Sequence, residues 1–515
     1  MTKRFTALLI CLLLVVTSFG GLGAFAQEDS AKTITISNDY AVTEGKSTWV
    51  DYLPSTNLMY RALLLADHNL QVIGGDLAEE YTVSEDGCTL TFTLKEGLKW
   101  SDGEDLTMDD VLWSFEIAPQ TQINATYTAA FSYIESVTAE GNVLTIQLTQ
   151  PYVDFLPTMA QFAILPEHCF EGVDPAEVST YADYWEFNPV CSGMMHQTEI
   201  VQDEYVVLEV NPYYEGPKPN IERIVVRCTQ DLSVEAQAGA LDMFFSSSAD
   251  VYEVVSALDT YSIHNAVFPY FRMCLFNVSG NDGNVNEYMN DPRIRQAITY
   301  GVDWKSIVES TFGERAMVTT TGVAATDPVY IGEQYSYDPD RARQLLEEAG
   351  YDFSHEFRLL YYYTDQTTID IIDAVVYYLS ELGIQARPIL SQNIAADVYE
   401  VRDWDMCYCG LASFSNLNWY NEYIDEVYMG KLMSQANTEF AALMEELTSA
   451  FDADVANDIY RQLQELEVET RYKFPVCTLN YQGYFSNRIQ LPEGVEFGNV
   501  SYHYDIDFAN WDIAE

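Results

Sequence analysis

The chain has 515 residues, of which 48% are hydrophobic and 20% are charged. This composition is typical of an ordered protein, and the length exceeds what a single core usually supports, so we expect two or three lobes. A total of 25 Lys and Arg against 79 Asp and Glu gives a formal net charge of -54, a field that repels nucleic acid and anionic membrane surfaces and attracts cations.

The N-terminus has the three parts of an export signal. The basic residues Lys3 and Arg4 precede the apolar run Phe5–Val16, and a small-x-small cleavage site follows at Ala24–Ala26. A bilayer-spanning helix takes roughly 20 residues, more than this run offers. We therefore predict that residues 1–26 are a signal peptide and that the protein is exported to the periplasm or the outer face of the cell membrane. The cysteine in the run follows Leu-Ile rather than a small residue, which does not support a lipid anchor.

The cysteines do not indicate a disulfide framework. Eight remain after cleavage, widely spaced in a large protein, and we expect several of them to be free and buried. Cys407 and Cys409 lie on the same face of a predicted strand, which permits a metal site, but no histidine stands nearby at ligand spacing. We therefore expect neither a metal site nor a cofactor.

A strand, a turn and a capped helix are predicted between residues 89 and 116. Apolar residues alternate through Leu90, Phe92 and Leu94, which indicates a half-buried strand. A tight turn follows at Ser101–Gly103. Thr107 and Asp110 then have the spacing of a capping box ahead of an apolar helical face. Trp100 and Trp113 are expected to be core residues.

The rest of the chain alternates short strands with helices, which favours α/β or α+β lobes. Strands are predicted at 33–37, 142–148, 201–210, 221–228 and 404–408, and the aromatic residues of 481–515 have a strand-like alternation. Helices are predicted at 293–300, 340–349, 369–382, 440–450 and 456–470; the first two begin at Asp-Pro pairs.

Five motifs occur in the order expected of one family. They are Trp100–Gly103 with Thr107 and Asp110-Val111; Asn188–Gly193; Asn211–Gly216; Asn290–Ile298; and Tyr337–Tyr351. This series resembles the family 5 extracellular solute-binding proteins, the oligopeptide and dipeptide binders that serve ABC importers.

The resemblance implies a type II periplasmic-binding-protein-like fold, with two α/β lobes joined at a hinge and an additional inserted lobe. It assigns residues 31–57, 173–275 and 481–515 to lobe I, 58–172 to the inserted lobe II and 276–480 to lobe III. It further implies a monomer that captures a small solute, a peptide in the leading hypothesis, by hinge closure and delivers it to a membrane permease driven by an ATPase.

The sequence departs from the family where peptide binders hold the ligand's ammonium group. In the Gly-Trp-x-x-Asp segment of such binders the Asp holds that group, whereas Leu411 and Phe414 stand at the Trp and Asp positions here. No Asp occurs between Asp405 and Asp425. Either another carboxylate replaces it or the ligand has no anchored amine, because an unpaired buried charge is costly. A second departure, Cys191–Met195, replaces the Gly-Thr-Gly-Pro-Tyr run near the crossing between lobes.

Three functions remain open at this point. Besides peptides, the same fold could take an oligosaccharide, a metal chelate or another non-peptide solute, as the missing Asp suggests. A secreted hydrolase is the third hypothesis, although no nucleophile-elbow, zinc-protease or phosphate-loop motif supports an enzyme. Because aromatic residues give large contact area at low entropy cost, the candidate cleft residues are mostly aromatic: Tyr40, Tyr127, Phe131, Tyr408, Cys409, Gly410, Ser413, Phe414, Asn416 and Trp419.

Overall fold

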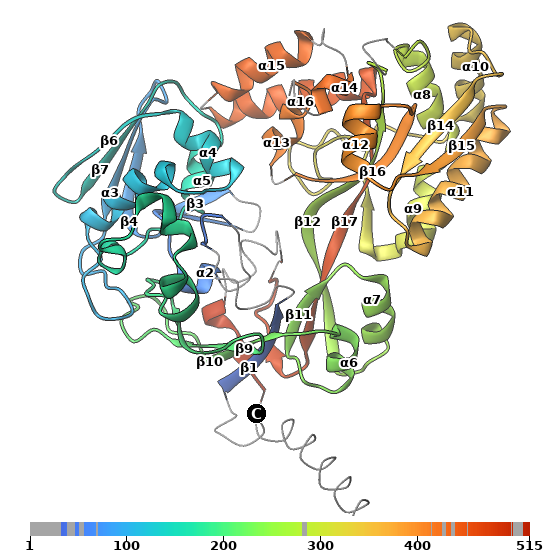
Figure 1. Ribbon diagram of the computed structural model, residues 1–515. Helices are drawn as coiled ribbons and strands as arrows, with labels where there is room; N and C mark the ends of the chain where they lie inside the picture. Colours follow the sequence, from blue (N-terminus) through green and yellow to red (C-terminus); the bar gives the residue numbers. More distant parts are fainter. Residues whose placement is uncertain are drawn as a thin grey trace, which may run out of the picture.

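The computed structural model shows two ends of a molecule linked by a pair of long strands (Figure 1). It describes residues 32–38, 47–50, 56–67, 71–280, 286–413, 415–424, 429–433, 438–450, 452–495, 497 and 508–514.

The two linking strands, β12 (Tyr261–Phe276) and β17 (Lys473–Ser486), pair antiparallel over most of their length. They belong to one 11-stranded sheet, in the order β15-β14-β16-β12-β17-β11-β1-β10-β9-β8, with β13 (Ala316–Val318) added on β17. The pairing shifts register between Val267 and Tyr270, and again between Arg272 and Met273. Bulges of this kind bend a strand and interrupt its ladder. The ladder that links the two ends is therefore interrupted at these two points.

At one end the sheet is of the α/β type. The strands β14 (Glu356–Tyr361), β15 (Gln385–Leu390) and β16 (Met406–Ala412) are parallel to one another, with β14 in the middle. Two cores cover the two faces of the sheet: one includes Phe357, Leu359 and Tyr408, the other Phe271, Met273 and Trp419. The helices at this end (Figure 1) are α8 (Pro292–Gly301), α9 (Trp304–Phe312), α10 (Pro339–Ala349), α11 (Gln366–Glu381), α12 (Ile394–Ala396), α13 (Asn416–Asn421), α14 (Met429–Met433), α15 (Thr438–Thr448) and α16 (Ala453–Thr470).

At the other end the same sheet continues through β11 (Met243–Ser246), β1 (Thr33–Asn38), β10 (Arg223–Cys228), β9 (Tyr205–Val210) and β8 (Met195–Val201). The short helices α6 (Leu232–Gln237) and α7 (Ala249–Ser256) lie beside it (Figure 1). The strand β1 pairs parallel with both β10 and β11, so the first described strand is interior to the sheet.

A separate four-stranded antiparallel sheet lies across from the α/β end (Figure 1). Its order is β4 (Ala78–Val83), β5 (Thr89–Leu94), β7 (Val143–Leu148) and β6 (Ile134–Glu140), and α3 (Met108–Ile117), α4 (Ala125–Ser132) and α5 (Phe155–Met159) accompany it. Smaller elements include α2 (Thr56–Met59), β2 (Leu64–Ala66), β3 (Val72–Gly75), the 3-10 helix η3 (Glu167–Phe170), β18 (Ile489–Gln490) and β19 (Asp512–Ile513).

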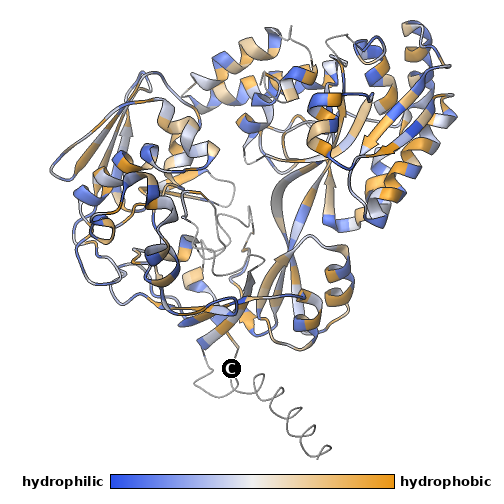
Figure 2. Cartoon of the chain, in the orientation of Figure 1, coloured by the Kyte–Doolittle hydropathy of each residue, from blue (hydrophilic) through white to orange (hydrophobic). Residues whose placement is uncertain are grey.

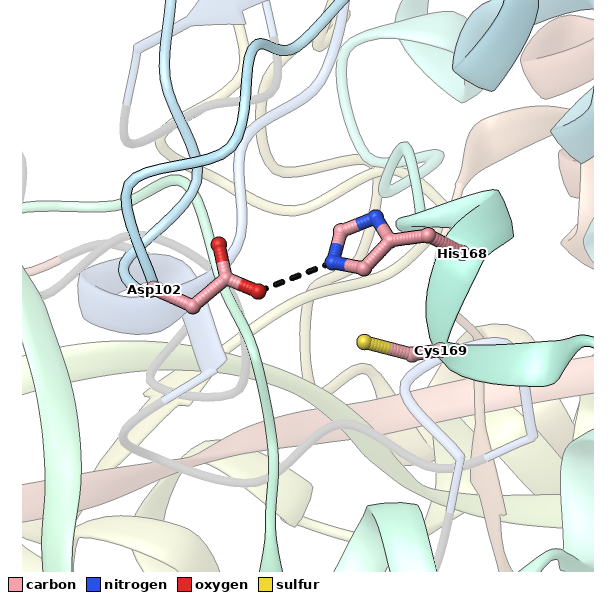
Figure 3. A group of neighbouring side chains, drawn as sticks. All are labelled: Asp102, His168 and Cys169. Atoms are coloured by element: carbon pink, nitrogen blue, oxygen red, sulfur yellow. Dashed lines mark hydrogen bonds and ion pairs between the residues drawn. The ribbon is translucent and has the colours of Figure 1, made fainter.

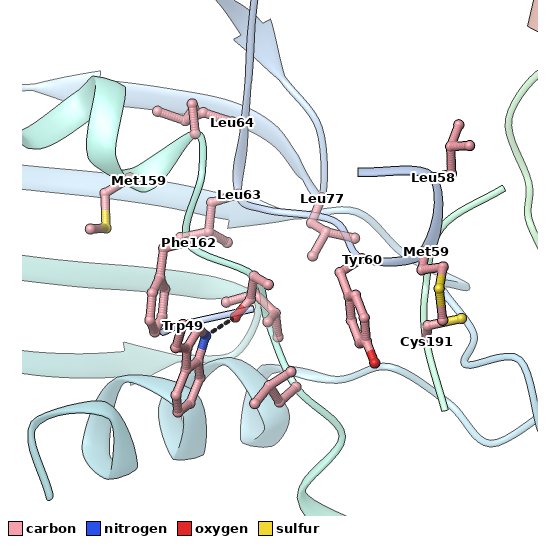
Figure 4. Close-up of a cluster of buried hydrophobic side chains, with 14 of the residues drawn as sticks. Trp49, Leu58, Met59, Tyr60, Leu63, Leu64, Leu77, Met159, Phe162 and Cys191 are labelled. Atoms are coloured by element: carbon pink, nitrogen blue, oxygen red, sulfur yellow. Dashed lines mark hydrogen bonds between the residues drawn. The ribbon is translucent and has the colours of Figure 1, made fainter. Parts of the chain in front are cut away.

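The core beneath this sheet is anchored by Trp49, which is fully buried (Figure 4). Its indole N–H donates to the Ala163 carbonyl oxygen at 2.9 Å, and its ring stacks on Phe162 at 5.1 Å between centroids. A buried tryptophan needs a partner for its N–H, and the carbonyl satisfies it. Residues far apart in sequence are thereby fixed in one core.

The predicted strand-turn-helix unit is confirmed. The strand β5 alternates between buried and half-buried residues, and the capping box of α3 has both of its hydrogen bonds, with Thr107 as N-cap and Asp110 at the third helical position. Trp100 is fully buried and donates to Asp110, whereas Trp113 is half-buried and stacks on Phe170. The unit therefore belongs to the core of the four-stranded-sheet lobe.

The predicted helices are confirmed as α8, α10, α11, α15 and α16, with ends that differ by a few residues. The single strand predicted at 201–210 is wrong. The chain turns at 202–204, where Asp203 has a φ of 60°, and the two parts belong to β8 and β9. Of the strand-like segment 481–515, the first six residues extend β17, while Tyr502 and Tyr504 lie outside the described residues.

The predicted lobe boundaries at 275/276 and 480/481 fall at the end of β12 and inside β17, so the crossing strands serve both lobes. The division of the chain into these lobes stays a prediction.

Figure 2 shows hydrophobic and hydrophilic residues interspersed along the helices and strands. In the described part of the chain, no helix has the length and apolar character needed to cross a membrane.

Candidate ligand-binding site

The carboxyl ends of β14 and β16 form one edge of the α/β sheet, which is where open parallel sheets bind ligands. The strand β14 ends at Tyr361, and Tyr362 and Tyr363 follow it directly. The strand β16 ends at Ala412, which pairs with Tyr270 of β12. The predicted site segment 409–416 therefore lies at this edge.

Arg272 of β12 lies at this edge without a carboxylate partner in the described part of the chain. It pairs with Gly410 across the strands, and its guanidinium lies over the Tyr363 ring, 3.8 Å from the centroid, and 5.4 Å from that of Tyr270. Its Nη1 atom is buried and has no hydrogen-bond partner. Buried donors are normally paired, so this atom calls for an explanation.

The described arginines that are more deeply buried than Arg272 are paired. Arg61 binds Asp76 and Glu215, with nitrogen–oxygen distances of 2.7 Å. Arg295 and Arg471 donate to main-chain carbonyl oxygens. The fold thus satisfies these guanidinium groups internally, in contrast to that of Arg272.

A chain of tyrosine hydroxyls fixes the aromatic rings around Arg272. The Gly410 N–H donates to the Tyr362 hydroxyl at 3.4 Å, Tyr362 donates to Tyr363 at 2.6 Å, and the hydroxyls of Tyr363 and Tyr270 share a further hydrogen bond. Burial raises the pKa of Tyr362 to about 12 and raises that of Tyr363 strongly. Both phenols are therefore neutral at pH 7 and give Arg272 no counter-charge.

Gly410 is required by this arrangement. A Cβ atom at position 410 would overlap the hydroxyl oxygens of both Tyr270 and Tyr363. The sequence singled out Gly410 as a cleft candidate, and the structure gives it the role of leaving room for the phenols beside Arg272.

A second contact joins the four-stranded-sheet lobe to the α/β end. The Ser415 hydroxyl donates to Asp154 Oδ2 at 3.1 Å across 261 residues of sequence. Tyr152 and Val153 pack against the core that contains Trp419, and Asn416 donates to Asp327 at 2.9 Å. Burial raises the pKa of Asp154 to about 6. A carboxylate far away in the sequence thus contacts Ser415, next to position 414.

The other predicted site residues are placed as follows. Tyr127 is fully buried and donates to the Gln161 carbonyl oxygen, and Phe131 packs on Phe115 and Phe162. Tyr408 and Cys409 are buried in the two sheet cores, and Ser413 donates to the Ser415 carbonyl oxygen. Tyr40 and Phe414 lie outside the described residues. Of the ten candidates, the structure brings Gly410, Ser413 and Asn416 close to the two polar features just described.

Trp419 belongs to a buried network that the sequence analysis did not find. Glu467, fully buried, accepts hydrogen bonds from the Trp419 indole, the hydroxyls of Tyr420 and Tyr423 and the Gly322 N–H. The Lys473 ammonium lies 3.8 Å from the Trp419 ring centroid, and burial lowers its pKa to about 8. The only sequence signal was a glutamate on the apolar stripe of its helix.

Asp102, His168 and Cys169 are the group of described residues with metal-ligand chemistry (Figure 3). His168 Nε2 and Asp102 Oδ2 are 2.8 Å apart, which joins the Trp100–Gly103 turn to η3. Burial, together with Asp102 and Asp110, raises the pKa of the Cys169 thiol to about 12. The group thus consists of a hydrogen-bonded Asp102–His168 pair beside a partly buried thiol. A cavity of about 640 Å³ next to it is lined by acidic residues, among them Glu104, Asp105 and Asp109.

Comparison with known proteins identifies the family. The model of the bacterial extracellular solute-binding proteins, family 5 Middle, matches residues 72–427, more than half of the chain. The chain belongs to this family. A putative ABC transporter peptide-binding protein of Brucella abortus is 28% identical over 368 residues, which cover 68% of this chain and 65% of that relative. The oligopeptide-binding protein AppA of Bacillus subtilis is 24% identical over 517 residues, covering 93% of this chain and 90% of that relative.

Solved structures show the same fold. The substrate-binding protein CtaP of Listeria monocytogenes superposes with a TM-score of 0.79 at 20% identity, over 95% of this chain and 100% of that one. NikZ of Campylobacter jejuni in complex with Ni(L-His) gives 0.72 at 19%, over 94% and 100%. AppA of Bacillus subtilis in complex with a nonapeptide gives 0.69 at 19%, over 95% and 100%. The fold of this family 5 protein is that of the type II periplasmic-binding proteins.

Proposed function

We propose that this family 5 protein is the extracytoplasmic receptor of an ABC importer and captures peptides between its lobes. The observation that carries the proposal is the β12–β17 ladder, which passes between the two ends and shifts register at two points. Lobe closure about such a link is a hinge motion, since a few residues absorb the backbone change. The peptide-binding names of the relatives support peptides as the ligand class.

In this proposal the signal sequence exports the chain, a monomer with the three predicted lobes, and the closed form docks on a permease pair driven by an ATPase. The ligand lies near the edge formed by β14 and β16, where Gly410, Ser413 and Asn416 are placed. Asp154 is a carboxylate near this segment, and it accepts a hydrogen bond from Ser415, next to position 414.

A non-peptide solute is the second candidate. Leu411 and Phe414 replace the residues with which the family's peptide binders hold an ammonium group. Solved relatives in the same fold include complexes with Ni(L-His) and with Fe(III)-EDTA. A family member without the usual Asp is compatible with such ligands.

The test is the identity of the bound solute. The chain without residues 1–26 is purified without a denaturation step, and native mass spectrometry measures any copurified ligand. The protein is then unfolded and refolded to remove any bound ligand. The refolded protein is screened by thermal shift against peptide pools of two to nine residues, with sugars and metal chelates as controls. A peptide ligand in either experiment supports the proposal. Binding restricted to the sugars or chelates contradicts its peptide version and favours the second candidate.

A further inference from the structure

Arg272 carries a positive charge that the described part of the fold does not balance. The titratable groups with the largest effect on it are Tyr408, Tyr363, Tyr270 and Cys477. Burial raises the pKa of the Cys477 thiol to about 12 and raises the pKa values of Tyr363 and Tyr408 well above their usual range, so these three groups are neutral at pH 7. The chain has 79 acidic residues, yet no carboxylate of the described residues pairs with this guanidinium. The buried Nη1 atom therefore has no hydrogen-bond partner among the described residues, and a ligand can supply one.

The surroundings hold the guanidinium in place without using its hydrogen-bonding edge. The Tyr363 ring lies against the face of the group, and the hydroxyl chain from Gly410 through Tyr362 fixes that ring. A guanidinium stacked by its face keeps its N–H fork in the plane of the group, the geometry that pairs with a carboxylate through two parallel hydrogen bonds. Arg272, Tyr363 and Gly410 are all partly exposed, so solvent reaches this edge.

We propose that Arg272, beside the Tyr363 and Tyr270 rings and opposite Gly410, binds a carboxylate group of the transported solute. This proposal rests on the receptor function proposed above. One guanidinium balances the single negative charge of one carboxylate group, whereas a phosphate dianion concentrates two charges on one group. The position agrees with the carboxyl ends of β14 and β16, where ligands of open parallel sheets bind.

The proposal also gives a reason for the missing ammonium anchor. A receptor that has lost the family's Asp at position 414 needs another charged contact to orient its ligand. Arg272 offers that contact with the opposite sign. A peptide would then be recognised by its C-terminal carboxylate, and acetylation of its N-terminus would change the affinity little.

The first experiment tests the anion site without peptides. Binding of succinate and of its uncharged analogue succinamide is measured by calorimetry and thermal shift in the wild type, in Arg272→Met and Arg272→Lys, and in the control Arg387→Met. Arg387 is an exposed arginine paired with Glu356. We expect succinate to bind at least tenfold more tightly than succinamide in the wild type and the control, with a smaller difference in the Lys variant and none in the Met variant.

The second experiment uses mixtures of tripeptides to pentapeptides in four forms, with free or acetylated N-termini and free or amidated C-termini. We expect amidation to weaken binding to the wild type at least tenfold and to have no effect on Arg272→Met. Equal binding of free and amidated peptides overturns the carboxylate site and leaves the peptide receptor standing. Binding of succinate without any peptide overturns the peptide version of the function and leaves the site standing.

Three further outcomes overturn the inference. The first is an Arg272→Met variant that binds succinate and free peptides as the wild type does. The second is inorganic phosphate binding more tightly than succinate through Arg272. The third is a wild type that binds neither succinate nor any of the peptides. Circular dichroism of each variant shows whether loss of binding reflects loss of the fold.

Discussion

The contact between Asp154 and Ser415 should make the stability of the protein depend on pH in a known direction. Burial raises the pKa of Asp154 from 3.8 to about 6. The folded protein therefore holds this proton more tightly than the unfolded chain does, and folding stability falls as the pH rises from about 4 to about 6. The Asp154→Asn variant keeps an oxygen that can accept the Ser415 hydroxyl but has no proton to lose.

The magnitude follows from the two pKa values. The difference between 3.8 and 6, at about 1.4 kcal/mol per pH unit, gives about 3 kcal/mol for a fully buried carboxylate. The side chain is partly exposed, so we expect about 2 kcal/mol. Asp154→Asn should thus be as stable as the wild type at pH 4 and about 2 kcal/mol more stable at pH 7.

Urea unfolding at pH 4, 5, 6 and 7 measures this difference, and the repulsion among the other acidic groups cancels between the two proteins. Asp340→Asn is the matched control, because the Asp340 side chain is 95% exposed and its loss should leave the difference near zero at every pH. A wild type more stable than Asp154→Asn at pH 7, or a difference that does not change between pH 4 and pH 7, would refute the reasoning.

Three substitutions test the buried groups of the α/β end. Glu467→Gln should lower the free energy of unfolding by about 3–5 kcal/mol, because four hydrogen-bond donors and Lys473 lose a buried anion. The control Glu465→Gln, at an exposed position of the same helix, should change it by less than about 0.5 kcal/mol. Urea unfolding measures both differences. Burial lowers the pKa of Lys473 to about 8, so the folded state binds fewer protons than the unfolded chain between pH 8 and 10.5 and gains stability as the pH rises through this window. Lys473→Met should lack that gain, and equal slopes between pH 8 and pH 9.5 in the two proteins would contradict the assignment. Gly410→Ala should cost about 1–3 kcal/mol and weaken succinate binding, since the added methyl displaces the phenols beside the guanidinium; an unchanged melting temperature would show that the phenols move freely.

The fold was predictable where the determining interactions are local. The capping box of Thr107 and Asp110 and the Asp-Pro starts of α8 and α10 depend on residues within one helical turn, so their letters alone located the helices. The prediction of a single strand at 201–210 was wrong because no local signal marks the turn within it. Its apolar alternation continues on both sides of a turn whose Asp203 adopts a positive φ without a glycine to mark it.

The candidate site was less predictable because burial is a tertiary property. Trp419 follows the segment with the family's ligand contacts, and its residue type suits a cleft, but its indole donates to a glutamate 48 residues away. Tyr127 likewise bonds to a carbonyl that another segment supplies. The contact between Asp154 and Ser415 joins residues 261 positions apart, so it could not be predicted from the sequence around position 414.

Arg272 shows why the net charge of the chain does not identify the ligand. A charge of -54 repels anions at long range, but at physiological ionic strength the field of exposed charges decays within about 8 Å. Within that distance a ligand interacts with the groups lining the site, and those around Arg272 are neutral phenols. The acidic surface therefore governs how solutes approach the protein, while the unpaired guanidinium determines which group is held. A receptor of this charge can bind a carboxylate because the site that contacts it has the opposite sign to the chain as a whole.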